Sequence, residues 1–311
     1  MSKNQTLLIL NPVAAKNRAG ERREEIETAL SARNIAFETR LTTAVWHAAG
    51  LARGAGAEGF TTIIAAGGDG TMNEVINGLM LAKADGGRIP DLGVLPVGRG
   101  NDFAFGMGLP SDLGEAADLI ASGRKGPLDV GFVKGGDYPL GRFFGNGLGV
   151  GFDALVGFAA AKITWVHGPL TYTLGALRIF ALFPDPVDVR LHFDSLDYEG
   201  RSHQISIMNG RRMGGAYYMA PEALVDDGLL DFCIVGDVSR REMAALIMRY
   251  TKGRQKGRPK VTMGRAASFL IEAPRGGLAV HADGETICER GRSVAVECRA
   301  GALTAYGLGG P

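Results

Sequence analysis

The chain has 311 residues, of which 46% are hydrophobic and 22% are charged, and its net charge is +1. This composition excludes a disordered or fibrous protein, and the near-neutral charge gives no reason to expect a nucleic-acid partner. Cys233, Cys288 and Cys298 form no CxxC pair, which favours a reduced, cytosolic setting over a disulfide framework or a zinc site. No segment has the length and apolar character of a signal peptide or a spanning helix, so we expect a soluble protein.

The N-terminal part of the chain alternates short apolar runs with helical patterns. The apolar runs predict four strands, at Thr6–Leu10, Phe37–Leu41, Thr61–Ala66 and Leu92–Pro96. The spacing between them predicts helices at Gly20–Arg33, near Ala44–Arg53 and at Thr71–Leu81. Strands that are apolar along their whole length are typical of a parallel sheet with both faces covered. We therefore predict an α/β domain here.

The pattern changes after Gly131. From Val187 onward, apolar and polar residues alternate in short stretches separated by turn residues, which predicts antiparallel strands in a sandwich or barrel. A helix over Arg240–Lys252 interrupts these strands. The longest apolar region, Phe152–Phe183, is broken by charged residues and prolines, and by base rate it belongs to the core.

The sharpest local feature is the loop Gly67–Gly70, which connects a buried strand directly to a helix with Thr71, Asn73 and Glu74 in its first turn. Glycines let backbone N–H groups approach an anion closely, and a helix N-terminus carries partial positive charge. The loop therefore predicts a phosphate site. The alternative is a plain turn in which Asp69 only caps the helix. A carboxylate beside phosphates would need a Mg²⁺ ion or a water molecule between them.

Two further loops follow strands of the same predicted sheet. Asn11-Pro12 comes after the first strand, with Lys16 and Arg18 just beyond it, and Gly98–Asp102 comes after the fourth. Each alone could be an ordinary turn. Because the carboxyl ends of parallel strands share one edge of a sheet, where such sheets bind ligands, the three loops together favour a binding site.

The motifs of these loops resemble the diacylglycerol kinase catalytic domain, a family that includes bacterial diacylglycerol kinases, YegS-like lipid kinases and sphingosine kinases. The matching segments are NPVAAK (11–16), GGDGTMNEVINGL (67–79), LPVGRGNDFA (95–104), DVG (129–131), PEALVDDGLLD (221–231) and HADGE (281–285). They cover nearly the whole chain in order. GGDGT alone also occurs in NAD kinases, but its combination with the other segments is specific.

The resemblance implies an α/β plus all-β fold. An N-terminal α/β nucleotide-binding domain, NAD kinase-like, would comprise residues 1–131 and a returning segment at about 300–311. An antiparallel β-sandwich domain for the lipid substrate would comprise residues 132–299, with ATP bound between the domains. The implied activity is an ATP- and Mg²⁺-dependent lipid kinase whose acceptor is diacylglycerol or a related glycerolipid. A cytoplasmic location, transient peripheral membrane contact and a homodimer are implied as well.

The resemblance also implies roles for individual residues. Asp283 and Glu285 would lie at the acceptor hydroxyl, where a carboxylate can take its proton. A structural Mg²⁺ would bind the Asp227 carboxylate and the backbone carbonyls of Leu224 and Leu229. By pattern alone, the Asp-Gly pairs of both segments equally indicate turns. The residues implied at the nucleotide are Asn11, Pro12, Val13, Ala14, Ala15, Lys16, Thr42, Gly67, Gly68, Asp69, Gly70, Thr71, Met72, Asn73, Glu74, Arg99 and Asn101.

Two other functions remain open on the sequence. An NAD kinase-like phosphotransferase shares the GGDG loop, but GNDFA and DDGLLD speak against it. A nucleotide- or lipid-binding regulator without catalysis is favoured by Arg99, since relatives usually carry a small residue there, whereas the intact DGE segment opposes it. The basic run Lys252–Lys260 indicates either a solvated loop or contact with anionic lipid headgroups. In the family context, part of Phe152–Phe183 would line an acyl-chain pocket.

Overall fold

The structure, a computed structural model, describes residues 6–14, 18–161, 163, 169–194 and 196–309. Ala15 and Lys16, both predicted at the nucleotide, lie outside the described residues. The chain divides into two compact units, Met1–Val130 with Ala300–Pro311 and Gly131–Arg299. The strands β5 (Lys125–Gly135) and β15 (Ser293–Tyr306) have residues in both units.

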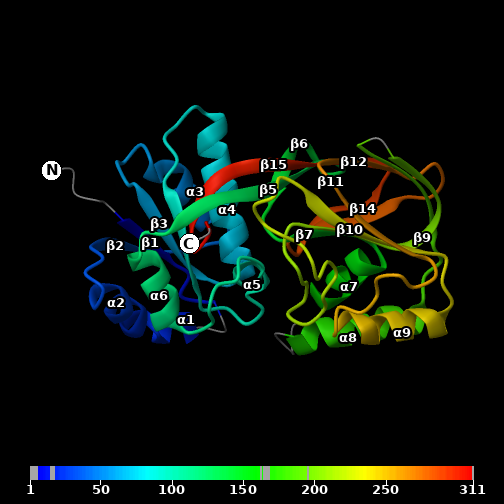
Figure 1. The fold of residues 1–311 in the computed structure, drawn as a ribbon, viewed down its shortest axis with the longest axis horizontal. Coiled ribbons are helices and arrows are strands. Elements are labelled where there is room, and N and C mark those ends of the chain that lie inside the picture. Colours follow the sequence, from blue (N-terminus) through cyan, green and yellow to red (C-terminus); the bar gives the residue numbers. More distant parts are fainter. Residues whose placement is uncertain (1–5, 15–17, 162, 164–168, 195, 310–311) are drawn as a thin grey trace. The chain divides into compact units, whose positions relative to one another are not determined.

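Unit 1 is built on a parallel sheet in the order β15-β4-β3-β1-β2 (Figure 1). The strands are β1 (Thr6–Leu10), β2 (Phe37–Leu41), β3 (Thr62–Gly67) and β4 (Asp91–Pro96). The helices are α1 (Arg18–Glu21), α2 (Arg23–Ser31), α3 (His47–Ala55), α4 (Asp69–Ala84), α5 (Asp102–Gly106) and α6 (Leu113–Ala121). The predicted parallel sheet is confirmed.

Both faces of this sheet are covered, as its continuous apolar strands predict. Leu8 and Leu10 of β1 pack in one cluster with Ile26 of α2 and with residues of α6. Their neighbours Leu7 and Ile9, which point to the opposite face, are also fully buried. This arrangement fixes the strand ends from which the glycine-rich loops leave.

Unit 2 is antiparallel, as predicted. Its strands are β6 (Tyr138–Phe144), β7 (Gly147–Gly151), β8 (Val187–Phe193), β9 (Leu196–Met208), β10 (Leu230–Gly236), β11 (Val261–Ala266), β12 (Ser268–Glu272), β13 (Leu278–Ala282) and β14 (Glu285–Gly291). They pair in the order β14-β13-β7-β9-β8-β12-β15, with β10 joining β9 to β11 and β6 pairing with β5.

Three helices accompany these strands: α7 (Phe152–Ala161), α8 (Pro169–Leu182) and α9 (Arg240–Tyr250). Sequence periodicity predicts α9, whereas α7 and α8 lie in the apolar region Phe152–Phe183 without a clear helical pattern. All three contribute to one apolar cluster, in which Ile179 of α8 and Met243 of α9 are buried. No helix in the described part of the chain is long and apolar enough to cross a membrane.

A capping box starts α9. The Ser239 hydroxyl accepts the N–H of Glu242, and the Glu242 carboxylate accepts the N–H of Ser239. These bonds, with Lys260 nearby, lower the pKa of Glu242 to about 2. A carboxyl whose pKa is lowered on folding stabilises the fold above its ordinary pKa and loses that effect as the pH falls toward the lowered value.

We expect Glu242→Ala to lower the melting temperature at about pH 7, since the Ser239 N–H at the start of α9 loses its carboxylate acceptor. The difference from the wild type should shrink at about pH 3, where the carboxylate begins to be protonated. Thermal unfolding followed by circular dichroism measures both. An equal difference at the two pH values would contradict this assignment.

Candidate functional site

The loop between β3 and α4 has an anion-binding geometry. Gly68 is the N-cap of α4 and Asp69 is the first helical residue, with no side-chain hydrogen bond capping the helix. The Asp69 carboxylate instead accepts the backbone N–H of Phe103 at 3.0 Å. The alternative in which Asp69 only caps its own helix is therefore wrong. Its side chain ties this loop to the start of α5.

The three predicted loops meet at this point. The Asn11 side chain donates a hydrogen bond to the Thr71 hydroxyl at 2.9 Å. A Cβ atom on Gly98 would lie 2.4 Å from the Cα of Gly68, so only glycine allows the loop Gly67–Gly70 and the loop after β4 to approach so closely. Each loop is thus held by another loop, and a rigid edge results at the carboxyl ends of β1, β3 and β4.

One side of this edge is open. Gly70 is exposed, and a Cβ atom there would meet no atom within 4 Å. The first N–H groups of a helix have no partner inside the helix, and they carry partial positive charge. Arg99 is exposed on the third loop, while Oδ1 of Asn101 is buried without a hydrogen-bond partner among the described residues. The edge therefore offers donors and a cation to an anionic ligand.

Two carboxylates flank the third loop. A Cβ atom on Gly100 would lie 2.8 Å from Oδ2 of Asp69 and 3.8 Å from Oδ2 of Asp102. Asp102 is only 5% exposed. Carboxylate oxygens near phosphate groups are the usual protein ligands of Mg²⁺. The sequence analysis assigned no role to Asp102, although this residue directly follows Asn101 in the GNDFA segment.

Other residues predicted at the nucleotide make contacts within the fold. The Glu74 carboxylate accepts the N–H of Ala48, at the start of α3. Met72 and Asn73 are buried in α4, and Thr42 is buried with its N–H bonded to Leu10. Pro12, Val13 and Ala14 lie in the first loop, where Val13 is exposed. Only part of the predicted set therefore faces the open side.

The DGE segment forms the turn of the β13–β14 hairpin, which confirms the prediction of a hairpin turn. Asp283 has a left-handed backbone with φ of 48°. Its carboxylate accepts three backbone N–H groups, from Gly145 at 2.7 Å, Asn146 at 3.1 Å and Gly147 at 2.9 Å. The direction of this carboxylate is thus fixed. Glu285 is half-exposed and lies 3.8 Å from the Arg142 guanidinium.

The DDGLLD segment is a turn before β10. The Asp227 carboxylate accepts the N–H of Leu229 at 3.0 Å and lies 3.1 Å from the Arg265 guanidinium. Nearby, Oδ2 of Asp231 is buried without a hydrogen-bond partner in the described chain. Burial raises the pKa of Asp231 to about 6. A buried carboxylate oxygen without a donor suits a cation, although Leu224, a predicted ligand, is 43% exposed.

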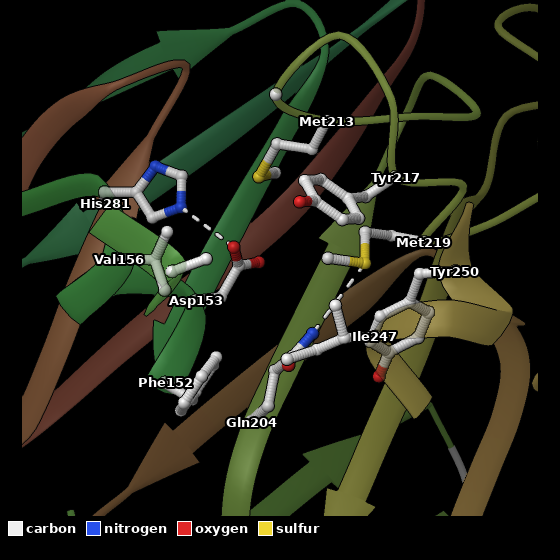
Figure 2. A pocket seen from close by; sticks show the side chains of 12 residues that line it. Phe152, Asp153, Val156, Gln204, Met213, Tyr217, Met219, Ile247, Tyr250 and His281 are labelled. Atoms are coloured by element: carbon white, nitrogen blue, oxygen red, sulfur yellow. Dashed lines mark hydrogen bonds and ion pairs between the residues drawn. The ribbon is translucent and has the colours of Figure 1, made fainter. Parts of the chain in front are cut away.

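An apolar pocket lies inside unit 2 (Figure 2), with a volume of about 50 Å³. Its walls come from α7, α8, α9, β9, β13 and the loop after β9. The lining residues are Phe152, Asp153, Val156, Ala176, Gln204, Met213, Gly214, Tyr217, Met219, Ile247, Tyr250 and His281. Phe152, Val156 and Ala176 belong to the apolar region predicted to contribute to such a pocket. A single water molecule needs about 10–15 Å³, so the cavity holds only a few atoms.

Asp153 and His281 form a polar pair in this apolar setting (Figure 2). Nε2 of His281 lies 3.8 Å from Oδ1 of Asp153, and neither ring nitrogen has a hydrogen-bond partner among the described residues. The other carboxylate oxygen of Asp153 accepts the Ser206 hydroxyl at 3.0 Å, and Gln204 donates to Ser206. His281 is 4% exposed and lies two residues before Asp283. Sequence analysis noted it only as part of the HADGE segment.

Comparison with known proteins gives the family. Residues 5–133 match the diacylglycerol kinase catalytic domain, and residues 147–306 match the YegS C-terminal NAD kinase beta sandwich-like domain. A protein of Xanthomonas axonopodis named "probable lipid kinase YegS-like" is 32% identical over 96% of this chain and 94% of its own length. The chain belongs to the diacylglycerol kinase-like family of lipid kinases.

Other members of the diacylglycerol kinase-like family are similar over most of their length. A diacylglycerol kinase of Bacillus subtilis is 29% identical over 87% of this chain and 90% of its own. The crystal structure of a diacylglycerol kinase from Bacillus anthracis has a TM-score of 0.72 and 22% identity, over 97% of this chain and 96% of that one. Yeast NADH kinase has a TM-score of 0.50 and 11% identity, over 97% and 82%. These two structures support the fold alone, including its NAD kinase-like character.

Proposed function

We propose that this protein transfers the γ-phosphoryl group of ATP to a hydroxyl of a lipid, with diacylglycerol or a related glycerolipid as the acceptor. The observation that carries the proposal is the rigid edge of three mutually bonded loops at the N-terminus of α4, in a chain of the diacylglycerol kinase-like family. Such an edge suits a nucleotide phosphate chain, because backbone N–H groups replace its water shell.

On the nucleotide side, backbone N–H groups and charged side chains of the three loops would bind the phosphate groups and their metal ion. The N–H groups at Gly68–Thr71 would bind phosphate oxygens, and Arg99 would add a contact with its guanidinium. Asp69 and Asp102, which flank one point near Gly100, would hold Mg²⁺. The ion would neutralise charge that develops on the transferred group. Phosphoryl transfer needs mainly position and charge stabilisation, which these groups provide.

On the acceptor side, Asp283 would take the proton of the attacking hydroxyl. The three N–H groups that it accepts keep its carboxylate in one direction, and a fixed base is the requirement for general base catalysis. Glu285, half-exposed beside Arg142, would act at the edge of the acceptor. The pocket of unit 2 would receive the part of the acyl chain that adjoins the lipid's polar group. Asp153 and His281, which line this pocket, would face that polar group.

The decisive experiment is transfer of labelled γ-phosphate from ATP with Mg²⁺. The acceptors are diacylglycerol, monoacylglycerol, phosphatidylglycerol, sphingosine and ceramide in mixed micelles, with NAD in solution. We expect label in a glycerolipid. Label in NAD alone would identify an NAD kinase-like enzyme, and ATP binding without any transfer would identify a regulator. Either result would refute the proposed function.

The pocket gives a test of acceptor binding. We expect Ala176→Phe, which fills part of the cavity from α8, to raise the KM for long-chain diacylglycerol at least about tenfold, because a pocket discriminates each methylene by roughly 1–3 kcal/mol. The KM for ATP should not change. The control is Ala84→Phe, which adds the same ring at an exposed helical position at the end of α4. Equal changes in both variants would contradict the pocket's role.

The DDGLLD turn gives a test of the second metal site, in which we propose that Asp227, Leu224 and Leu229 hold Mg²⁺. Without nucleotide, Mg²⁺ should raise the melting temperature, because a ligand at about 100 times its Kd stabilises the fold by about 2.7 kcal/mol. Asp227→Asn should remove most of this rise, whereas Asp69→Asn should retain it. A rise that survives in Asp227→Asn would place the ion elsewhere.

A further inference from the structure

The pocket of unit 2 contains one polar point whose ligand the proposed function does not name. Asp153 and His281 lie there among apolar walls, and the two residues are 9% and 4% exposed. Figure 2 shows them facing each other, with Nε2 of His281 3.8 Å from Oδ1 of Asp153. This distance is too long for a hydrogen bond. The two side chains are therefore close enough to share a third group, but too far apart to bond to each other.

The Asp153 carboxylate is held in place by a chain of buried hydrogen bonds. Its Oδ2 atom accepts the Ser206 hydroxyl at 3.0 Å, and the side-chain amide of Gln204 donates to Ser206 at 3.1 Å. Because the Ser206 oxygen receives that amide hydrogen, its own proton points to Asp153. These bonds fix the carboxylate as an acceptor and leave its Oδ1 atom on the side of His281.

Glycine at position 149 makes room for this arrangement. A Cβ atom there would lie 2.5 Å from Nε2 of His281 and 2.6 Å from Oδ2 of Asp153. Gly149 is directly opposite His281 in the pairing of β7 with β13, so a larger residue would push both side chains away. Neither ring nitrogen of His281 has a hydrogen-bond partner among the described residues. Since buried polar atoms in native proteins nearly always have a partner, this point suits a group that another molecule supplies.

We propose that this point binds a second hydroxyl of the acceptor, so that the enzyme selects a glycerolipid with two free hydroxyls over diacylglycerol. A hydroxyl can donate to Oδ1 of Asp153 while it accepts the N–H of a neutral imidazole. The carbonyl oxygen of an ester can only accept, and it would face the carboxylate with no hydrogen between them. The inference rests on the proposed function, since it names the group of the lipid that the pocket selects.

The size and place of the pocket support a hydroxyl as the ligand. Its volume of about 50 Å³ is enough for a hydroxyl and its carbon, since one water molecule needs about 10–15 Å³. His281 and Asp283 lie opposite Gly149 and Gly147 of β7, about 7 Å apart along the strand. A three-carbon headgroup can span this distance with its hydrogen bonds, so one hydroxyl would meet Asp283 while the other enters the pocket.

A metal ion fits this point less well than a hydroxyl does. The described part of the chain contains no group of three or more His, Cys, Asp or Glu side chains that could hold a metal ion. Protein sites for transition metals usually supply at least three ligands. Asp153 and His281 alone would therefore bind an ion weakly.

The test is isothermal titration calorimetry of the full chain with three short-chain ethers below their micelle concentrations. The compounds are 1-O-octylglycerol, which has two hydroxyls, 3-octyloxypropan-1-ol, which lacks the second one, and 2-amino-3-octyloxypropan-1-ol. We expect the diol to bind at least about tenfold more tightly than the mono-ol, because a site built for a hydroxyl rejects the analogue without it. A general apolar pocket would give the opposite order, since the mono-ol is the more hydrophobic compound.

Variants assign the preference to the pair. His281→Leu and Asp153→Asn should each lower the ratio of the two affinities at least about threefold, because each removes one of the two groups that bond to the second hydroxyl. Tyr250→Phe is the matched control, since it removes a buried hydroxyl from another part of the same pocket (Figure 2). It should keep the ratio of the wild type. Melting temperatures show that the variants compared are folded.

Equal or unmeasurable binding of the diol and the mono-ol by the wild type would overturn the inference, as would a ratio that both pair variants retain. Tighter binding of the amino alcohol than of the diol would also overturn it, and would assign the point to an ammonium group. Transfer of labelled phosphate separates this inference from the proposed function. Preference for the diol in a protein that phosphorylates no lipid would refute the proposed function alone, whereas lipid phosphorylation with equal binding of both compounds would refute this inference alone.

Discussion

Asp283→Asn is expected to lower phosphoryl transfer by about 10²–10⁴-fold, the usual contribution of a positioned base. The amide removes the proton acceptor, and it also replaces one carboxylate oxygen with a donor that faces backbone N–H groups of residues 145–147. ATP binding should be retained, because the nucleotide loops are held by their own hydrogen bonds. Labelled phosphate transfer and equilibrium ATP binding measure the two effects.

Glu285→Gln separates the two carboxylates of the DGE segment. Among the residues that the structure describes, no backbone N–H donates to the Glu285 carboxylate, which lies 3.8 Å from the Arg142 guanidinium. We expect its substitution to lower transfer by less than about tenfold. The melting temperatures of both variants show how much of each loss comes from the turn. A larger loss of turnover in Glu285→Gln than in Asp283→Asn would reverse the assigned roles.

Gly70→Ala is expected to weaken ATP binding while leaving the fold intact. The structure has space for a Cβ atom at Gly70, and alanine in a helix is favoured over glycine by roughly 0.5–1 kcal/mol. The melting temperature should therefore stay the same or rise. That space is where the phosphate chain would lie, so the methyl group should weaken ATP binding at least about tenfold, or about 1.4 kcal/mol.

The matched control is Gly50→Ala. Gly50 lies in α3, is exposed, and likewise has no atom within 4 Å of an added Cβ. It should give the same small stabilisation and normal ATP binding, as isothermal titration calorimetry measures. If both variants bound ATP equally well, Gly70 would not face the phosphates and the site would have to lie elsewhere.

Hydrophobic pattern was enough to predict the sheet of unit 1. The strands β1 and β3 are apolar along nearly their whole length, whereas β2 is the more polar segment FETRL. Thr6–Leu10 and Phe37–Leu41 were nevertheless located to the residue. In the structure, the predicted helix Gly20–Arg33 is interrupted at Arg22. The prediction missed this break because no local pattern in the sequence marks it. The helices α7 and α8 were missed, since a segment that packs on several sides has no amphipathic period.

The candidate site was predicted in part. Motifs located the three loops, but which residues face a ligand depends on packing between loops. Glu74 bonds to α3 and Asp69 to Phe103, and neither contact can be inferred from a spacing along the chain. Asp102 and His281 were overlooked for the same reason. What marks both residues is the burial of a polar side chain. This burial is visible only in the three-dimensional structure.

The small volume of the pocket in unit 2 also bears on inhibitors. If the pocket receives the acceptor as proposed, a compound that competes with the acceptor has to bind a widened form of the cavity, and its apparent affinity falls by the fraction of molecules in that form. Association rates should therefore be slow and should depend little on the compound's own diffusion. Compounds selected by residence time, rather than by fit to the narrow cavity, would exploit this property.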